Sequence, residues 1–565
     1  MRGAIALANN DVAFVSWSYD SKIPNCLGFS LRRIDAAGMP SVLPAWVGFQ
    51  GDSNPQWLGR TTDDWPVQKF NWRDFTAKPG GTYRYQIVPM IGAPGQLEPA
   101  TQQALETNPV TLTPQYGPFL AYFNRGILST QSVAHLLPED AKGSPSSSAL
   151  VKHITTPGDP VRMRLAGQMI DALGSLLQQA KAEGGECYCA LYELSDAELV
   201  AELLAAGSSV HIVLSNTGPD DATDAPTRKQ LHDAGLDITD RMLGSNHIGH
   251  NKFVVYVDSK GTPQAVLTGS TNWTSTAICG QSNNALICRD ATIAATYRDY
   301  WDRLKADGQA QGADFRTANN QRRPIASLGA DVWFSPNTPQ KSKGTAMPGD
   351  LTEVADEIGK AQEAILFLLF QPGSPSVLDD IVKANKANPN LFVRGAATDP
   401  KAVEQFNTEL YHRSATETPD VVNDTAAVAA SAVPDTFAYW HKELLKSSPS
   451  AHAIIHDKVI VIDPFSDKAV VITGSHNLGF KASYANDENM IIVRGHQDLA
   501  AAYTTHVTDV YDHYRWRYWL QQAGTKAWTG LVTTDAWQDG YFGSGSAAAK
   551  EIDFWQSARQ PAGVR

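Results

Sequence analysis

The sequence predicts an α/β protein made of two α/β/α lobes related by pseudo-twofold symmetry and preceded by an all-β sandwich. Three observations favour this fold class. The chain has 565 residues, too many for a single hydrophobic core. Short strand-like runs fill its first part, whereas strand-length and helix-length apolar segments alternate in the remainder. One set of polar motifs also occurs twice with nearly equal spacing, which indicates a duplicated unit.

Residues 1–115 are predicted to form the sandwich. The runs 11–19, 28–35 and 82–90 alternate apolar and polar side chains and are separated by turn residues. The stretch 75–87, with Trp17 on an earlier strand, resembles the fibronectin type III pattern. We expect Trp17 and Tyr85 to pack in the core, with ligand binding as the alternative.

Residues 120–318 are predicted to form the first lobe and residues 319–565 the second. In each lobe a helix pattern precedes an apolar strand pattern, and the pair is then repeated. The first lobe has a helix pattern from residue 164, a strand at 187–193, a helix at 196–206 and a strand at 209–215. The second has helices at 351–361 and 377–387, a strand at 364–371 and another from residue 391.

The stretch 415–434 interrupts the second lobe. It is rich in Ala, Val, Thr and Pro and precedes the second polar motif. We interpret it as a candidate mobile lid over the site, with a surface insertion of no function as the alternative.

The repeated motif places the same four kinds of side chain in each lobe. His and Lys are two residues apart beside β-branched residues, so both are expected on one face of a strand. Ser and Asn, also two residues apart, follow a glycine on a predicted neighbouring strand. The eight residues are His250, Lys252, Ser270 and Asn272 in the first copy and His456, Lys458, Ser475 and Asn477 in the second.

This set of side chains fits the cleavage of a phosphodiester. Ammonium groups and neutral donors bind the non-bridging oxygens and stabilise the charge of the transition state. One neutral imidazole attacks phosphorus, while a protonated imidazole gives its proton to the leaving oxygen. Each copy supplies one histidine to this chemistry, so the two lobes are predicted to face each other around one shared site.

With these motifs the chain resembles the phospholipase D superfamily, whose mark is a duplicated His-x-Lys-x4-Asp motif followed by Gly-Ser-x-x-Asn or a close variant. The second copy has this spacing up to Asp463, whereas one extra residue precedes Asp258 in the first. Both copies read Gly-Ser-x-Asn. The resemblance covers roughly residues 120–520. We expect no metal ion or other cofactor, because lysine is a poor ligand and no Cys or carboxylate triad has zinc spacing.

The copies differ at the position that bears on the roles of the histidines. The superfamily often has Asn-x-Glu after the second motif, with a Glu that orients the motif histidine; Glu488 stands there, and Asn283 stands in the first copy. A carboxylate beside His456 would raise its pKa and suit a general acid, whereas His250 beside a neutral Asn283 would suit the nucleophile. A carboxylate can equally make its histidine more nucleophilic. The resemblance implies attack by the first-motif histidine, which favours His250.

Two further residues end matched strands, where α/β sheets place functional side chains. They are Glu193 and Gln371, with helix capping as the alternative. The predicted catalytic residues are His250, Lys252, Asn272, His456, Lys458, Asn477 and Glu488. The predicted substrate-binding residues are Ser270, Ser475, Asn283, Glu193 and Gln371.

The stretch 511–519 interleaves aromatic and basic residues, which favours docking of a terminal helix; binding of nucleobases or a lipid headgroup is the alternative.

Composition limits the partners and the location. The 47 basic and 59 acidic side chains give a net charge of −12, which repels nucleic acid and anionic membranes unless a local basic cleft overcomes it. Five cysteines are too few to staple a chain of this size, and we expect them to be mostly buried and reduced. The apolar core of the first residues is too short for a secretory signal, and no apolar run is long enough to cross a bilayer. We expect a cytoplasmic protein, or one exported without a cleavable signal peptide.

The sequence therefore favours a phospholipase D-type phosphodiesterase that hydrolyses a phospholipid headgroup or transfers the phosphatidyl group to an alcohol. The acidic balance and the two large, unlike lobes differ from the small, duplex-gripping nucleases of the superfamily. A metal-independent endonuclease is the alternative, and nucleic acid is expected as a partner only in that case. A third class, a non-catalytic binding protein on a hydrolase scaffold, is disfavoured because both sets of His, Lys and Asn are intact. We expect a monomer with peripheral membrane contact.

Overall fold

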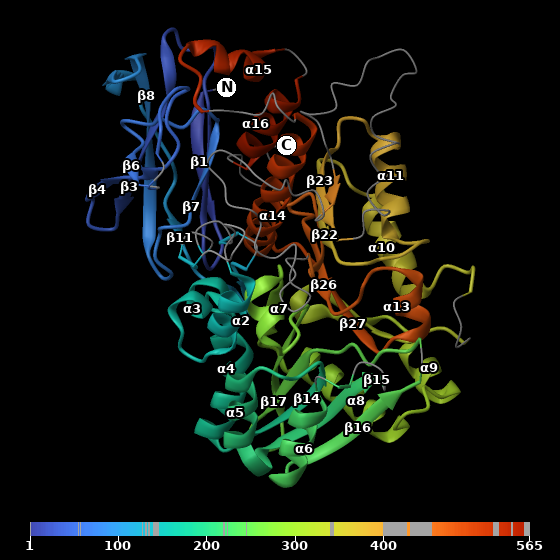
Figure 1. Cartoon of the computed structure of the whole chain (residues 1–565). Coiled ribbons are helices and arrows are strands. Elements are labelled where there is room, and N and C mark those ends of the chain that lie inside the picture. Colours follow the sequence, from blue (N-terminus) through green and yellow to red (C-terminus); the bar gives the residue numbers. More distant parts are fainter. Residues whose placement is uncertain are drawn as a thin grey trace.

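The computed structural model describes residues 2–565 except 55, 57, 127, 130–132, 134–135, 139–145, 218–220, 223, 245, 340–343, 399–426, 430–454, 524–529, 544–545 and 559–565. The chain forms an all-β N-terminal part and two α/β lobes (Figure 1). The N-terminal strands, in blue, lie beside the C-terminal helices, and the first lobe, in green, lies below the second. The predicted fold class is confirmed.

The N-terminal part consists of two larger antiparallel sheets and a two-stranded one, β5 (Pro44–Ala45) with β6 (Arg60–Thr61). One has the strand order β1 (Gly3–Ala8), β2 (Ala13–Ser18) and β7 (Asn71–Asp74). The other has the order β10 (Leu105–Glu106), β8 (Thr82–Ala93), β3 (Cys26–Asp35) and β4 (Pro40–Val42), with β9 (Gln96–Pro99) and β11 (Val110–Thr111) also paired to β8. Trp17 and Tyr85 are buried in the core between the sheets, as predicted. The likeness to fibronectin type III stays a prediction.

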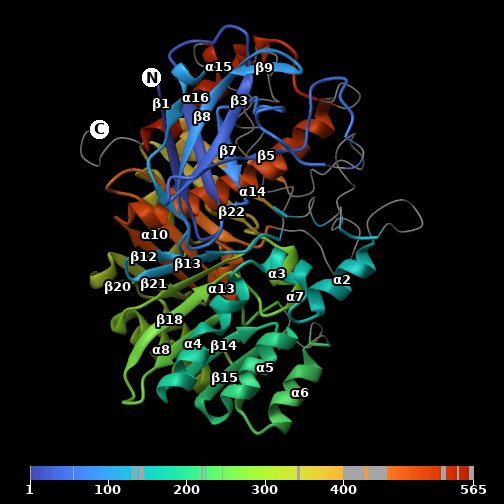
Figure 2. The same cartoon turned by 90° about the vertical axis from the view of Figure 1, so that its left-hand side faces the viewer.

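The end of the chain packs on this sandwich. The 3-10 helix η5 (Asp535–Gln538) and the helices α15 (Asp539–Phe542) and α16 (Ala547–Ser557) follow α14 (Gln497–Ala523). Trp537 packs against the sandwich core, and its Nε1 donates to the Cys26 carbonyl at 2.9 Å. Figure 2 shows the sandwich strands in front of α14 and α16. Residues from both ends of the chain therefore complete one core.

The first lobe contains an eight-stranded sheet. Its order is β12 (Gln115–Tyr116), β13 (Phe119–Phe123), β19 (Asn284–Cys288), β18 (Pro263–Gly269), β17 (Phe253–Val257), β14 (Glu186–Tyr192), β15 (Val210–Thr217) and β16 (Asp237–Leu243). The helices are α2 (Ser147–Thr155), α3 (Pro160–Ala166), α4 (Met169–Glu183), α5 (Ala197–Ala206), α6 (Ala225–Asp233), α7 (Ser275–Gly280), α8 (Ala291–Asp307) and α9 (Ala313–Asn319).

The second lobe repeats the order of the first. Its sheet runs β20 (Arg323–Ile325), β21 (Ala330–Ser335), β27 (Glu488–Arg494), β26 (Val470–Gly474), β25 (Lys458–Ile462), β22 (Ala364–Leu369), β23 (Phe392–Ala397) and β24 (Ala427–Ala429). Helices α10 (Gly349–Gly359), α11 (Val377–Ala387) and α13 (Phe480–Ala485) precede α14. The candidate lid at 415–434 lies outside the described residues, apart from the backbone of β24.

The two lobes share one hydrophobic core. Helices α8 and α14 contribute to it, together with strands of both sheets. Along β17, Phe253 and Val255 face this shared core, whereas Val254 and Tyr256 face the outer core of the first lobe. Both faces of the central strands are thus buried, which explains their continuous apolar sequence.

In the described part of the chain, no helix combines the length and the apolar character that a membrane crossing requires.

Candidate active site

The motif histidines lie where the two lobes join. His250 and Lys252 come directly before β17, and Lys458 is the first residue of β25, so each pair stands at the start of its strand. At both points a backbone hydrogen bond connects the two lobes. The His250 N–H donates to the Asp487 carbonyl at 2.8 Å, and the His456 N–H donates to the Ser282 carbonyl at 3.1 Å. Each histidine is therefore fixed by the backbone of the opposite lobe.

The two imidazoles face one shared site. Their ring centroids are 6.2 Å apart and their planes are nearly perpendicular. His250 is 5% exposed and His456 is 4% exposed, so the space between them is shielded from solvent. The predicted convergence of the two copies is present in the geometry, although the catalytic roles of these residues stay predictions.

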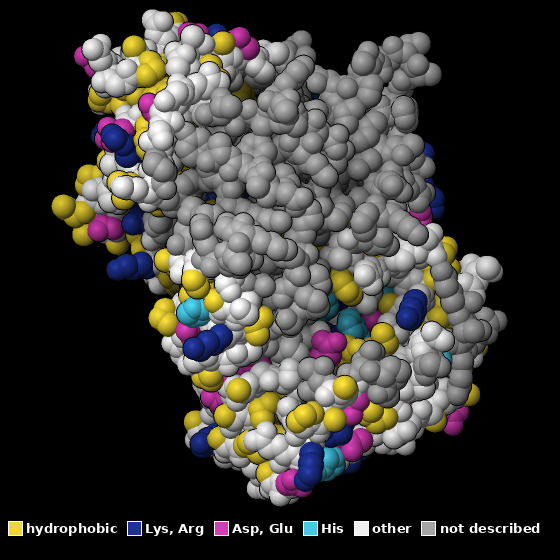
Figure 3. Space-filling model, in the orientation of Figure 1, with side chains coloured by type: hydrophobic (Ala, Val, Ile, Leu, Met, Phe, Trp, Pro, Cys, Tyr) yellow, Lys and Arg dark blue, Asp and Glu magenta, His cyan; other side chains and the backbone are white. Residues whose placement is uncertain are grey.

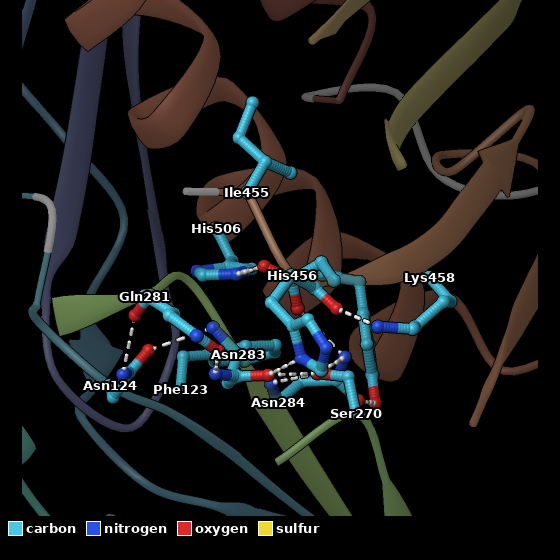
Figure 4. Close-up of polar contacts among 12 residues, drawn as sticks. Phe123, Asn124, Ser270, Gln281, Asn283, Asn284, Ile455, His456, Lys458 and His506 are labelled. Atoms are coloured by element: carbon cyan, nitrogen blue, oxygen red, sulfur yellow. Dashed lines mark hydrogen bonds and ion pairs between the residues drawn. The ribbon is translucent and has the colours of Figure 1, made fainter. Parts of the chain in front are cut away.

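The partners of the histidines are exchanged between the lobes. Nδ1 of His250 lies 3.2 Å from Oε1 of Glu488, and Nδ1 of His456 donates to Oδ1 of Asn283 at 3.0 Å. Figure 4 shows Asn283 and Ser270 next to His456. The expectation that Glu488 lies beside His456 and Asn283 beside His250 is wrong. Both residues stand at the interlobe ends of their strand segments, where their side chains reach the histidine of the other lobe.

Glu488 is a buried, ionised carboxylate. Burial alone would raise its pKa, but the charge and hydrogen bond of His250 and the Asn486 amide outweigh burial and hold the pKa at about 2. Asn486 Nδ2 donates to Oε1 at 2.8 Å, and the Asn477 backbone N–H donates to Oε2 at 2.7 Å. This carboxylate fixes a proton on Nδ1 of His250 and leaves Nε2 as the reactive nitrogen.

The two lysines carry the positive charge of the site. Nζ of Lys252 donates to the His250 carbonyl at 2.7 Å, and Nζ of Lys458 donates to the His456 carbonyl at 2.5 Å. Burial lowers the pKa of Lys252 to about 7, and burial with the nearby Lys252 charge lowers the pKa of Lys458 well below its ordinary value. Burial and the Lys252 charge also lower the pKa of His250 to about 4. A bound anion would relieve this concentration of like charge.

An aromatic ring covers each ammonium. The Tyr192 ring centroid is 5.2 Å from Nζ of Lys252, and the Phe370 centroid is 5.0 Å from Nζ of Lys458. The same rings lie 5.4 Å and 4.9 Å from the His250 and His456 rings. Sequence reasoning missed both residues, although each occupies the end of a matched strand beside the predicted Glu193 or Gln371.

The motif serines and asparagines have different surroundings. Both serine hydroxyls accept from the N–H of a matched asparagine, Ser270 from Asn284 at 3.1 Å and Ser475 from Asn489 at 3.0 Å. Ser270 Oγ also donates to Oδ1 of Asn283 at 2.8 Å. Asn272 donates from Nδ2 to the Glu193 carboxylate. Within the described residues, the side-chain oxygens of Asn272 and Asn477 are buried without a hydrogen-bond partner. These two amides are therefore polar groups that substrate atoms could satisfy.

The remaining predicted residues differ in their burial and contacts. Glu193 is half-buried beside Asn272 and has a positive φ of 53°, a strained backbone conformation typical of functional sites. Gln371 is exposed, two residues beyond β22.

Asp258 lies in a surface turn, where it accepts from the N–H groups of Lys260 and Thr262. Asp463 accepts from three N–H groups at the start of β22, so neither motif aspartate contacts the histidines through a described hydrogen bond.

Sequence reasoning also missed a layer of polar residues behind the histidines. Asn284 and Asn489 each donate through Nδ2 to the motif serine of their own lobe, at 3.4 Å and 3.2 Å. Both asparagines directly follow the residue paired with a histidine. Superposing the two sequence copies would have revealed them, because they occupy matched positions.

Among the described residues, no group of three or more His, Cys, Asp or Glu side chains is placed to hold a metal ion, and all five cysteines are buried and unpaired.

The fold and this site define a two-lobed enzyme class in which duplicated His-Lys motifs converge at one interface. A family model described as "Cardiolipin synthase, PLD-like domain" matches residues 173–305 and 354–510, which is more than half of the chain. The chain belongs to the phospholipase D superfamily. Its members are enzymes that handle phosphodiesters, which supports a general role in phosphoryl transfer or hydrolysis.

Solved structures with a similar fold include three enzymes. Polyphosphate kinase from Porphyromonas gingivalis has 13% identity and a TM-score of 0.35, with 57% of this chain and 46% of that chain covered. This chain thus spans less than half of that kinase. Phosphatidylserine synthase from Haemophilus influenzae Rd KW20 has 10% identity and a TM-score of 0.41, covering 62% and 85%. Yeast tyrosyl-DNA phosphodiesterase has 10% identity and a TM-score of 0.31, covering 56% and 84%. No curated protein matches the sequence.

Proposed function

We propose that the protein is a phospholipase D-type phosphodiesterase that cleaves a phospholipid headgroup through a covalent phosphohistidine. One observation carries the proposal: two buried imidazoles stand 6.2 Å apart, each held at Nδ1 by a side chain of the opposite lobe. Because each Nδ1 is engaged, each Nε2 is left for chemistry. Two reactive nitrogens on opposite sides of one phosphorus are what an in-line displacement requires.

In the first step Nε2 of His250 attacks phosphorus. A P–N bond forms, the bond from phosphorus to the headgroup oxygen breaks, and a proton on Nε2 of His456 moves to that oxygen. Phosphorylation leaves the imidazole of His250 cationic, and the Glu488 carboxylate at 3.2 Å stabilises that cation. The assignment of attack to His250 is thus kept, although the reason is the reverse of the one suggested by the sequence.

In the second step Nε2 of His456 acts as a base. It takes a proton from water, or from another alcohol, as the oxygen of that molecule attacks phosphorus. The P–O bond forms, the P–N bond breaks and its electron pair returns to His250. Water gives hydrolysis and an alcohol gives transphosphatidylation, so the same site supports both outcomes.

The lysines and the motif asparagines serve as the phosphate clamp. Without a bound anion, burial and the two lysines keep the pKa of His456 well below its ordinary value. A phosphodiester between Lys252 and Lys458 offsets their charge, so binding raises the pKa of His456 and lets it hold the proton that the leaving alcohol needs. The amides of Asn272 and Asn477 would donate to the non-bridging oxygens after reorientation.

The charge of the chain favours a phospholipid over nucleic acid as the substrate. The net charge is −12, and the Lys and Arg side chains visible in Figure 3 are scattered rather than gathered in a stripe. Duplex binding depends on several phosphate contacts by basic side chains. A lipid headgroup presents a single phosphodiester, for which the two lysines of the site suffice. Peripheral membrane contact belongs to this proposal.

The test offers the protein both kinds of phosphodiester, with and without EDTA. Phosphatidylcholine with a primary alcohol is expected to yield phosphatidic acid and the phosphatidyl alcohol, equally in both conditions. Single- and double-stranded DNA are offered separately. Cleavage of DNA alone, unaffected by the chelator, would replace this proposal with a metal-independent endonuclease. Cleavage of neither would favour a non-catalytic binding protein, and loss of lipid cleavage in EDTA would contradict the metal-free chemistry.

A further inference from the structure

A chain of hydrogen bonds leads from His456 into the protein. Figure 4 shows its first members, Asn283, Ser270 and Asn284, around the His456 ring. Asn283 accepts from Nδ1 of His456 at 3.0 Å and from Ser270 Oγ at 2.8 Å. Ser270 in turn accepts from Nδ2 of Asn284 at 3.4 Å. The residues in direct contact with His456 along this chain are therefore neutral.

A buried carboxylate stands at the far end of this chain. Asn284 Nδ2 also donates to Oδ1 of Asp457 at 2.8 Å, and Nε2 of His506 donates to Oδ2 at 3.0 Å. Asp457 and His506 are fully or almost fully buried. Burial would raise the pKa of Asp457, but His506 and the hydrogen bonds outweigh burial and keep it below its ordinary value, so the carboxylate is ionised.

The first lobe has neutral residues at the matched positions. Asn489 Nδ2 donates to Oδ1 of Asn251 at 2.9 Å, and Asn251 Nδ2 donates to the Tyr300 hydroxyl at 3.2 Å. Asn251 lies between His250 and Lys252, as Asp457 lies between His456 and Lys458. Tyr300 stacks on Phe334 at 4.0 Å, and His506 stacks on Phe123 at 4.4 Å. The Asp457–His506 pair thus replaces an Asn–Tyr pair in the same framework.

The other acidic neighbours of His506 have partners of their own. Asp11 pairs with Arg125, and Asp509 pairs with Arg73. Asp457 is the carboxylate to which His506 donates, and within the described residues Nδ1 of His506 has no hydrogen-bond partner. Nε2 is therefore the nitrogen through which His506 holds Asp457.

Each catalytic histidine is consequently backed by one carboxylate, but at a different distance. Glu488 touches His250, whereas hydrogen bonds connect Asp457 to the His456 ring through Asn284, Ser270 and Asn283. We infer that Asp457 and His506 form a positioning pair that orients Asn283 and tunes His456 for donating its proton to the leaving alcohol. This inference rests on the proposed function.

The distance of the carboxylate matters because the two histidines have opposite tasks. His250 must carry positive charge while phosphorus is bound to it, which a carboxylate in contact stabilises. His456 must give its proton away in the first step, which a contacting carboxylate would oppose. A remote carboxylate can polarise the hydrogen-bond chain and fix the ring without holding the proton.

The test replaces Asp457 and His506 with the residue types at the matched positions of the first lobe, Asn and Tyr. The variant Asp457→Asn/His506→Tyr is compared with wild type on phosphatidylcholine and on phosphatidyl-p-nitrophenol, which share the phosphatidyl group. The oxygen of choline must be protonated as it leaves, whereas p-nitrophenol can leave as the phenolate anion without receiving a proton. The rate of the first step, from pre-steady-state measurements, should fall by about tenfold or more with phosphatidylcholine and by less than about twofold with the nitrophenyl ester.

Single variants and a control keep the result interpretable if the double variant folds poorly. Asp457→Asn alone should show the same dependence on the leaving group. His506→Gln keeps an N–H donor for Asp457 and should retain at least about half of the wild-type rate with phosphatidylcholine. Asp258→Asn, in the surface turn of the first motif, should change neither rate. Folding is checked by circular dichroism and by Tm.

Equal losses on both esters would show a merely structural role and overturn the inference, as would unchanged rates. Wild-type protein that cleaves neither ester would overturn the proposed function itself, and the inference with it. The leaving-group dependence thus separates failure of the inference from failure of the function on which it rests.

Discussion

The two lobes place their eight strands in the same order, yet they distribute charge around their histidines differently. The second lobe supplies Glu488, which contacts His250, and the first supplies the neutral Asn283, which contacts His456. Behind the histidines the second lobe again supplies the carboxylate, Asp457, and the first lobe the neutral residue, Asn251, but this carboxylate serves His456 and not His250. A duplicated scaffold can therefore assign unequal duties through a few matched substitutions, while strands, serines and lysines stay the same.

The largest expected effects come from removing either histidine. His250→Ala removes the nucleophile and should lower kcat by about 10⁴-fold or more. His456→Ala removes the acid and base and should lower kcat by about 10²–10⁴-fold with phosphatidylcholine. Initial rates of folded, purified variants give both values.

A burst experiment sharpens this comparison. With phosphatidyl-p-nitrophenol, His456→Ala should release one nitrophenol per site and then stall, because the second step lacks its base. His250→Ala should release none. The reverse pattern would exchange the two roles, and near wild-type turnover of His456→Ala would rule out a shared site.

The next effect concerns the two exchanged partners. Glu488→Gln should lower kcat by about 10²-fold, which corresponds to a charge-assisted hydrogen bond of roughly 2–3 kcal/mol. Asn283→Asp places a carboxylate beside His456, where it should raise the pKa of that imidazole and move the basic limb of the kcat/KM profile to higher pH. A pH–rate profile of each variant measures both changes. Equal, pH-independent losses in the two variants would mean that the partners only hold the rings in place.

The two motif aspartates offer a comparison of stability. Asp463 accepts from the N–H groups of Gln362, Glu363 and Ala364 at 2.7–2.9 Å, whereas Asp258 caps an exposed turn. Asp463→Ala should lower the free energy of unfolding by about 2–3 kcal/mol, because it leaves one buried and two partly buried donors without their acceptor. Asp258→Ala should leave Tm unchanged. Denaturant unfolding of both variants tests this, and equal stabilities would show that Asp463 does not anchor β22.

Much of this asymmetry was visible in the sequence, but its direction was not. Periodicity predicted the strands around Cys187 and Ala364 and the helices that follow them, because apolar patterns follow local geometry. The eight motif residues were predicted by their repetition. The pairing of Glu488 with His250 depends on which lobe each strand end approaches, and no local pattern encodes that approach. His506 lies on a long helix far from the motifs, so only the fold brings it to Asp457.

The smallest expected effect is a dependence of stability on pH. The pKa of His250 falls from an ordinary 6.5 to about 4 in the folded protein, chiefly because the ring is buried. Below its ordinary pKa the unfolded chain binds a proton that the folded chain does not, so stability falls as pH decreases through this window. Between about pH 7 and about pH 5 the free energy of unfolding should drop by roughly 2 kcal/mol from this group alone.

The window lies above the ordinary pKa of Glu488, which is 4.5, so that this carboxylate is mostly ionised in both states. Denaturant unfolding at the two pH values is measured for wild type and for His250→Gln, which keeps a side chain of similar reach but cannot titrate. The variant should show a smaller drop than wild type by about the amount assigned to His250. His456 is buried with a pKa shifted in the same direction and remains in both proteins, so it does not affect the difference. An identical drop in the two proteins would mean that folding does not lower the pKa of His250, which would contradict the shift expected from its burial.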